Sequence, residues 1–381
     1  MTQNYNQTSG FEPWDLNNLQ YYNTAGNLMG IGTPTQNTDF KRAISNILLQ
    51  RTNMGSSLLT IQINDPKRAV LRDGLIKQGM TIALPGADGR TPALSYTLTQ
   101  FVKASDQMQL IFESTGVYML RNFGRGIKLT GGKGPQFVSS FMRRLVTEIN
   151  QGPLKGKNQM GFHGPDFATT LNILRARDTK KTYYTPAVMN NIQSFLVGRG
   201  AGGGPSIDTN EDSWTCMSRI ASSVGWRLWE YDNTIFFGPD EYWLGLLPGQ
   251  DVNKPPVNLK YYDKTKATFP AYIPTLSEFT KEIQLIDFDW NVNKPLAAAS
   301  VTVVLDAAAF NIGQVVQLSG VGIANGKWIV TQMQRNMFMP TMALGLSVPI
   351  PTGTLITPNS LPQAAFPLIA PPPVKPPLKK K

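Results

Sequence analysis

Residues 211–243 read EDSWTCMSRIASSVGWRLWEYDNTIFFGPDEYW and carry the clearest local pattern in the chain. Asp212 or Ser213 can cap a helix by accepting a backbone N–H from its first turn. Apolar residues then recur at steps of three and four, which gives the helix one apolar face: Trp214, Met217, Ile220, Ala221 and Val224. Gly225 stands where a left-handed C-cap belongs. The pattern therefore predicts a helix that ends at Gly225.

Directly after this helix the period changes to that of a strand. One face of this strand would carry Trp226, Leu228 and Glu230. The opposite face would carry Arg227, Trp229 and Tyr231. Asp232-Asn233 tolerates a tight turn, residues 235–237 return as a second strand, and Gly238-Pro239 ends it. The stretch predicts a helix followed by a tight hairpin. It is rich in tryptophan and has no reactive constellation.

A β region precedes this module and another follows it. The first has short alternating segments, each ended by turn-forming residues, at 59–64, 80–84, 96–102 and 108–113. The second has segments of the same kind at 301–305, 315–318, 328–333 and 342–348. Several short strands in so short a stretch indicate a small antiparallel barrel or sandwich.

The two β regions share an order of features. In the first, a strand ends at Asp65, Gly79 precedes the next strand, and Thr99-Gln100 lies in a later one. In the second, the matching features are Asp306, Gly313 and Thr331-Gln332. Small β domains that merely resemble each other would explain this order. The sharper interpretation is two copies of one unit, with the helical module inserted between them.

The remaining segments have biased compositions and no core pattern of their own. In the segment after the first β region, residues 137–149 have the apolar spacing of an amphipathic helix. We expect the following division: N-terminal arm 1–40; first β domain 41–125; helical segment and glycine-rich linker 126–210; helix–hairpin module 211–250; linker 251–278; second β domain 279–350; Pro/Lys-rich tail 351–381.

Eight residues in the two ends are candidates for contacts with other proteins. The arm is rich in Asn, Gln and Thr, and four aromatic residues could anchor it: Phe11, Trp14, Tyr21 and Tyr22. A plain disordered arm explains the same composition. The tail is polyproline-like with a cationic tip, formed by Lys375, Lys379, Lys380 and Lys381. We predict these eight as assembly-interface residues.

Charge and cysteine content limit the class of protein. The formal net charge is +11, but the four lysines of the tail supply part of it, so the excess elsewhere is mild. Cys216 is the only cysteine, which rules out an intrachain disulfide, and its place in the helix favours a small core residue over a nucleophile. The N-terminus has no secretory pattern, and no apolar run approaches the ~20 residues that span a bilayer. We expect a soluble protein made in a reducing cytoplasm, without stable membrane insertion.

Most catalytic designs are absent. One histidine, His163, and one cysteine cannot make a zinc cluster or a convincing nucleophile–base pair. Lys133 is followed by Gly134-Pro135, so the glycine-rich stretch before it fails as a phosphate loop. Two carboxylates could still act as acid and base, and Asp287 and Asp289 share a face of a predicted strand. Solvent-facing strand positions explain that pair more simply. We therefore predict no enzyme, no cofactor and no metal.

Three segments carry a resemblance to a known family. They are SLLTIQINDPKRAVLRDGLIKQGMTIAL, EDSWTCMSRIASSVGWRLWEYDNTIFFG and GKWIVTQMQRNMFMPTMALGLSVP. The chain resembles the tail hub, or baseplate hub, proteins of long-tailed bacteriophages, the group that includes late-control proteins. The residues that match the family's patterns in the middle and closing segments are Trp214, Ile220, Ala221, Gly225, Trp226, Phe237, Gly238, Gly326, Trp328, Val330, Arg335 and Phe338.

The resemblance implies a fold that is α+β and mainly β, with two tail-tube-like small antiparallel β-barrel domains and a helix-plus-hairpin insert between them. It implies a homotrimer whose two domains per chain imitate six subunits. Such a ring joins a sixfold tail tube to a threefold tip at the distal end of the virion's tail and lines the DNA exit channel. The implied partners are the distal tail or tail-tube protein, tape-measure protein, tip or fibre proteins, and DNA in transit.

Two other classes stay open from the residues alone. Relatives often carry a lysozyme or peptidase domain after the hub, whereas here a Pro/Lys-rich stretch occupies that place, so we expect no murein hydrolysis. The first alternative is nevertheless a cell-wall glycan hydrolase of a phage tail, which would use paired carboxylates. The second is a nucleic-acid-binding β protein, which would use the basic excess.

Overall fold

The structure of the chain is a computed structural model. It describes the following residues: 20–22, 28–29, 40–65, 70, 76–77, 79–84, 94–125, 136–155, 159–170, 196–197, 211–239, 242, 275–276, 285–290, 298–304, 312–313, 315–336, 338–339 and 341–347. Phe11, Trp14, Lys375, Lys379, Lys380 and Lys381 lie outside the described residues.

Two groups of five strands correspond to the two predicted β regions. We name the first lobe by its strands β3 (Ile44–Thr52), β4 (Leu58–Asn64), β5 (Thr81–Leu84), β6 (Leu94–Ala104) and β7 (Gln107–Ser114). The second lobe consists of β14 (Leu285–Trp290), β15 (Ala298–Val304), β16 (Val315–Leu318), β17 (Gly326–Asn336) and β18 (Thr341–Ser347), with a short 3-10 turn η4 (Gly322–Ala324). The fold is α+β and mainly β, as predicted.

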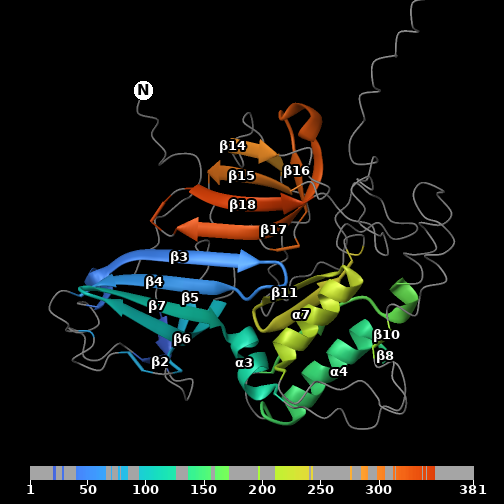
Figure 1. The fold of residues 1–381 in the computed structure, drawn as a ribbon, viewed down its shortest axis with the longest axis horizontal. Coiled ribbons are helices and arrows are strands. Elements are labelled where there is room, and N and C mark those ends of the chain that lie inside the picture. Colours follow the sequence, from blue (N-terminus) through green and yellow to red (C-terminus); the bar gives the residue numbers. More distant parts are fainter. Residues whose placement is uncertain are drawn as a thin grey trace, which may run out of the picture.

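The two lobes form one continuous antiparallel sheet, because β17 of the second lobe pairs with β3 of the first (Figure 1). The strand order is β14-β15-β18-β17-β3-β4-β7-β6-β5, and it continues through β1 (Gln20–Tyr22) to β2 (Leu28–Met29). A further strand, β13 (Thr275–Leu276), pairs in parallel with β16. Among the described strands neither lobe closes into a barrel. In the first lobe the outer edge of β3 is taken up by the pairing with β17, whereas the outer edge of β14 in the second lobe has no described partner.

The lobes have the same internal connections. In each, the first strand pairs with the second, the second with the fifth, the fifth with the fourth and the fourth with the third. The first strand of each also has a register shift near its start, which skips Ser45 in β3 and Ile286 in β14. Because both the order and the irregularity repeat, the two-copy interpretation of the sequence is confirmed at the level of strand topology.

The predicted Thr-Gln pairs mark a second shared irregularity. The pairing of β6 with β7 skips Thr99, and the pairing of β17 with β18 skips Thr331. The Thr99 hydroxyl donates to the carbonyl of Ile111 at 3.1 Å, and the Thr331 hydroxyl donates to that of Gly345 at 3.2 Å. In both lobes the accepting residue is the one paired with the glutamine that follows. Each threonine therefore satisfies the same carbonyl beside the same β-bulge.

The two predicted glycines also occupy matching places. Gly79 and Gly313 precede the third strand of their lobes and have φ of +73° and +81°, a region that residues with a Cβ rarely adopt. At Gly313 a Cβ would also lie 2.3 Å from the ring of Trp229. This glycine thus allows the hairpin of the module to approach the second lobe closely.

The module between the lobes contains the predicted helix and hairpin. Helix α7 (Ser213–Val224) begins at Asp212, whose carboxylate accepts from the Thr215 N–H at 2.8 Å, and ends at Gly225 with φ of +68°. Strands β11 (Arg227–Tyr231) and β12 (Thr234–Gly238) follow. They turn through Asp232 and Asn233, which both have positive φ, as a type I′ hairpin requires.

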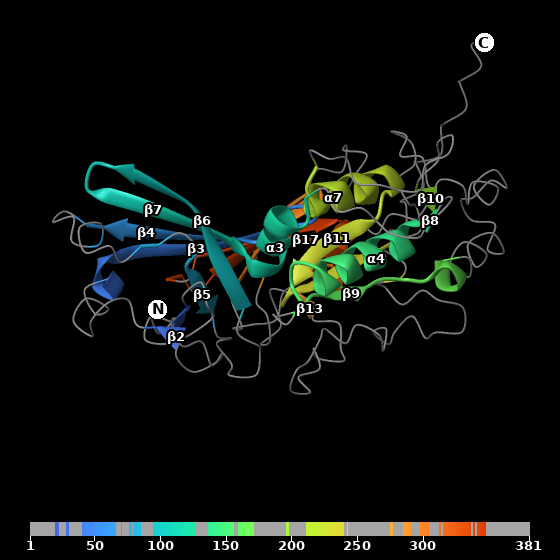
Figure 2. The ribbon, with the colours of Figure 1, turned by 90° about the horizontal axis from the view of Figure 1, so that it is seen from below.

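Five more elements complete the module (Figure 2). Helix α3 (Thr115–Phe123) continues directly from β7, and helix α4 (Val138–Gln151) packs with α3 and α7 around one apolar core. Strand β9 (Gly161–His163) adds to β12 in parallel. The short strands β8 (Gln136–Phe137) and β10 (Leu196–Val197) pair with each other. The helix predicted from Phe137 thus begins one residue later, since Phe137 ends β8.

The hairpin has a different core on each face, as its alternation predicted. Trp226 and Leu228 belong to the core of the helices, whereas Trp229 and Tyr231 belong to the core of the sheet. All five residues of β11 are buried. The hairpin is therefore the layer that fastens the helical module to the two lobes.

Candidate assembly surfaces

The turn between β3 and β4 connects the first lobe, the second lobe and the module. The Asn53 N–H donates to the carbonyl of Thr331 in the second lobe at 2.8 Å. The Asn53 side-chain oxygen accepts from the Leu228 N–H at 3.1 Å, and the Met54 N–H donates to the Leu228 carbonyl at 2.7 Å. One short turn therefore makes hydrogen bonds to both the second lobe and the module.

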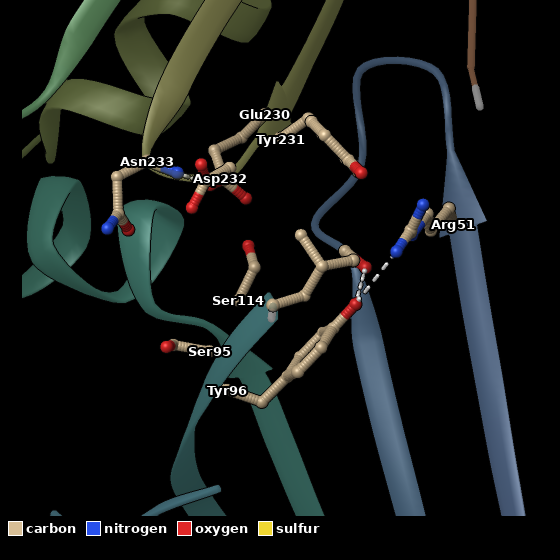
Figure 3. A pocket seen from close by; sticks show the side chains of 10 residues that line it. Arg51, Ser95, Tyr96, Ser114, Glu230, Tyr231, Asp232 and Asn233 are labelled. Carbon is tan, nitrogen blue, oxygen red and sulfur yellow. Dashed lines mark hydrogen bonds between the residues drawn. The ribbon is translucent and has the colours of Figure 1, made fainter. Parts of the chain in front are cut away.

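A buried polar cluster lies beneath this turn (Figure 3). The Tyr96 hydroxyl accepts from the Arg51 guanidinium at 3.3 Å and is 3.1 Å from the Ser57 hydroxyl. The Arg51 guanidinium also lies 5.4 Å from the centre of the Tyr231 ring. Strands of the first lobe thus meet the hairpin through a cation, a phenol and an aromatic face.

Glu230 is the acid of this cluster. Its Oε1 accepts from the Asn233 N–H at 2.7 Å, and a Cβ on Gly116 of α3 would lie 2.7 Å from the same oxygen. Burial raises the pKa of Glu230 to about 7, an effect that the nearby Ser114 hydroxyl, the hydrogen bond from Asn233 and the charge of Arg51 only partly offset. Because α3 closes over the carboxyl, we interpret Glu230 as a structural latch between helix and hairpin.

A second buried cation lies where the lobes join. Arg335 of β17 is paired with Leu49 of β3 and is only 7% exposed. Burial, together with the charge of Arg51, lowers the pKa of Arg335 to about 10. Arg335 is one of the residues that carry the family resemblance. Its position indicates that the motif serves the junction between the lobes.

The structure describes two of the eight predicted assembly residues. Tyr21 and Tyr22 lie in β1, paired with Ile82 and Thr81 of β5. This part of the predicted arm therefore extends the sheet of the first lobe. The assignment of all eight residues to contacts with other proteins stays a prediction.

The four residues considered above for a catalytic role lie at positions that a structural role explains. Asp287 and Asp289 are exposed on the edge strand β14. His163 lies in β9, with its Nε2 3.3 Å from the Tyr242 hydroxyl. Cys216 is buried, and burial raises the pKa of its thiol to about 12, which disfavours a thiolate nucleophile. In the described part of the chain, no group of three or more His, Cys, Asp or Glu residues could hold a metal ion.

Sequence reasoning missed two edges of the sheet that no described strand covers, one along part of β6 and one along β14. In β6 every side chain from Thr99 to Ala104 is exposed, with Phe101 at 55% and Val102 at 42%. No described strand pairs with residues 100–104 on the side away from β7. At the other end, β14 has β15 on one side and no described strand on the other. A possible signal was the apolar pair Phe101-Val102 beside Lys103, beyond the reach of the shorter strand β5.

The helices among the described residues are all too short or too polar to cross a bilayer.

Comparisons with known proteins give matches to solved structures. No protein-family model matches the chain, and no curated relative does. The chain is similar to the prophage tail protein gp18 of Listeria monocytogenes EGD-e, with 9% identity, a TM-score of 0.44 and coverage of 87% of this chain and 94% of that one. It is similar to the 43 kDa tail protein of prophage MuSo2 from Shewanella oneidensis, with 8% identity, a TM-score of 0.46 and coverage of 87% and 98%. It is also similar to an E. coli type VI secretion component described as structurally similar to the T4 tail proteins gp27 and gp5, with 11% identity, a TM-score of 0.44 and coverage of 81% and 73%. Likeness at this level does not assign a function.

Proposed function

We propose that the chain is a structural hub protein of a bacteriophage tail tip or baseplate. In this proposal it forms a homotrimeric ring that joins a sixfold tail tube to a threefold tip and lines the DNA exit channel. The observation that carries the proposal is the duplication within the chain: two lobes share strand order and both strand irregularities. Three copies of such a chain supply six similar lobes, which is what a match between sixfold and threefold symmetry requires.

The residues of the family resemblance support this proposal by where they lie. Trp214, Trp226 and Trp328 are among the largest fully buried side chains. Gly225 is the left-handed cap of α7, and Arg335 lies at the junction of the lobes. These residues maintain the module and its attachment to the sheet, so a resemblance in them is a resemblance in architecture.

The proposed role is mechanical, and the proposed partners follow from it. One face of the ring would contact the distal tail or tail-tube protein and the other the tip or fibre proteins. The channel would pass tape-measure protein and then DNA. The protein would be made in the host cytoplasm and lie at the distal end of the tail. Asp287 and Asp289, the carboxylates of the hydrolase alternative, are exposed on a strand as ordinary solvent-facing residues.

Native mass spectrometry of the purified chain tests the proposal. We expect a species of about 126 kDa, three times the 42.0 kDa chain, whose population rises with concentration. A trimer that appears only with an added tail-tube protein would also support the hub. A chain that stays monomeric at every concentration and with every tail component would overturn it. Cell-wall zymography with Asp287→Asn and Asp289→Asn as controls separates the hydrolase: clearing that both variants abolish would replace the structural role.

A further inference from the structure

The two ends of helix α3 are held unequally. The helix follows β7 directly, its preceding residue Ser114 makes no side-chain cap bond, and its first turn contains no acidic residue. The far end is fastened to α7, because the Ser213 hydroxyl donates to the Gly124 carbonyl at 2.6 Å. A first turn whose N–H groups lack a capping acceptor opens more easily than a capped one. The start of α3 is therefore the end of the helix that can open locally.

This first turn is held by its contact with Glu230 of the hairpin. Besides an approach of the Thr115 and Thr97 hydroxyls to 3.1 Å, the turn places Gly116 against the Glu230 carboxyl. A Cβ on Gly116 would lie 2.7–2.9 Å from three atoms of the Glu230 side chain. Only the absence of a side chain at this position allows the approach. The turn thus forms a lid on a carboxyl that is 8% exposed.

Space for water lies beside the same carboxyl. A cavity large enough for about one water molecule is lined by Ser114, Glu230 and Asp232, together with other polar groups. The Ser114 hydroxyl points toward the carboxylates of Glu230 and Asp232 (Figure 3). It is buried and has no hydrogen-bond partner among the described residues. A water molecule that entered here would find a donor in Ser114 and acceptors in the carboxylates.

The charges around Glu230 do not compensate its burial. The titratable groups that line the cavity or belong to the elements packed against it are Arg51, Tyr96, Glu113, Arg121, Tyr231 and Asp232. Arg51 of β3 favours the ionised carboxyl, whereas Asp232 of the turn disfavours it. Arg121, the one charged residue of α3, is paired with Glu113 of β7 at 3.3 Å. Burial is the largest influence and favours the protonated acid.

We propose that the contact between the first turn of α3 and the hairpin is a proton-controlled joint. With Glu230 protonated, the turn lies closed over a neutral carboxyl. When Glu230 releases its proton to solvent, water enters the cavity and the turn opens, since an ionised carboxyl is costly to keep dry. Because β7 runs directly into α3, pH thereby changes how firmly the first lobe holds the helical module. The joint does not depend on the proposed assembly of the chain.

The direction of the effect follows from the two states of Glu230. Its pKa is about 7 in the closed state, above the ordinary value of 4.5 that a carboxyl exposed by the open turn would have. The closed state is therefore fully favoured below pH 4.5 and loses this preference as the pH rises through about 7. Between pH 5.5 and pH 8.5, the ratio of open to closed molecules should rise about 30-fold.

Labelling of a buried thiol tests the joint in the full chain. Val117 is fully buried in the core of the helices, so iodoacetamide reaches a thiol in Val117→Cys only when the first turn opens. We divide its labelling rate by the rate of the same thiol in a Glu230→Gln chain, which cancels the ionisation of the thiol itself. This ratio should rise about 30-fold between pH 5.5 and pH 8.5. The chain with Cys216 as its only thiol measures the background.

Leu59→Cys is the matched control, because Leu59 is equally buried but lies in β4 of the sheet. Its thiol reacts only through global unfolding, so Val117→Cys should react about tenfold faster or more at pH 8.5. A second variant, Gly116→Ala, places a Cβ against the carboxyl and should raise the Val117→Cys rate about tenfold at pH 5.5. Equal rates at the two sites, a ratio that does not change with pH, or no effect of Gly116→Ala would each overturn the joint.

Discussion

Buried charge at the meeting point of the two lobes and the module is the main feature at the scale of single residues. Glu230, Arg51 and Arg335 are each less than 10% exposed and come from the hairpin, the first lobe and the second lobe. The charge of Arg51 favours the ionised form of Glu230 and disfavours the charged form of Arg335. The cluster therefore ties the geometry of the three parts to the ionisation of a few groups.

Glu230 makes the stability of this junction depend on pH. Its folded-state pKa of about 7 lies above the ordinary value of 4.5, so the folded state binds the proton more tightly. The contribution of protonated Glu230 to the free energy of unfolding is fully present below pH 4.5 and is lost as the pH rises through about 7. For a pKa shift of this size the free energy of unfolding changes by about 3 kcal/mol.

Glu230→Gln should remove this dependence, because its neutral amide imitates the protonated acid at every pH. In urea unfolding, we expect the free energy of unfolding of the variant, relative to that of the wild type, to rise by up to about 3 kcal/mol between pH 4.5 and pH 8. Other raised carboxyls, such as Glu113, titrate in both proteins and cancel in the difference. A difference that stays constant over this range would contradict the latch role of Glu230.

At the scale of elements, what the sequence predicts depends on how local the determining contacts are. Helix α7 and its hairpin were predictable because Asp212, Gly225 and Asp232-Asn233 determine caps and turn from their own side chains. Helix α3 was not, since it has no side-chain cap and no acid in its first turn. Strand β9 has three residues and exists because β12 pairs with it.

The candidate site was the least predictable part. Pairing of β3 with β17 joins residues some 280 positions apart, and the sequence of neither strand identifies the other as its partner. The β6 edge could be recognised only by comparing two lobes and noting which one lacks a strand. By contrast, Gly79, Gly313 and the two threonines were visible as a repeat, because each serves a local turn or bulge.

The turn after β3 gives a prediction at this scale. Asn53→Ala removes the acceptor for the Leu228 N–H, which lies in the part-buried contact between hairpin and sheet. Leaving such a donor unsatisfied costs about 1–3 kcal/mol, so the urea midpoint should fall. Asn122→Ala is the control, since its side-chain bond to the Tyr118 carbonyl is exposed and its loss should change stability by less than about 0.5 kcal/mol. Equal effects would mean that the Asn53 contact does not hold the module.

At the scale of the whole molecule, the chain has an asymmetry that its duplication does not explain by itself. The junction with β3 covers residues 332–335 of β17, whereas the matching residues of β6 and the outer edge of β14 have no described strand beside them. In a duplicated chain that acted alone, closing or blocking these edges would prevent unwanted strand pairing with other chains. A chain that repeats the same junction between copies needs both edges open.

Amide hydrogen exchange can separate these two cases in the wild-type protein. Residues 332–335 are paired on both sides within the chain, so their protection should not depend on protein concentration. Residues 100–104 are paired only with β7, so in dilute monomer about half of their amides should exchange quickly. Assembly should slow those amides at least tenfold and leave the exchange of residues 332–335 unchanged. If both segments gain protection together, concentration tightens the whole fold. If residues 100–104 stay fast in the oligomer, the copies meet through another surface.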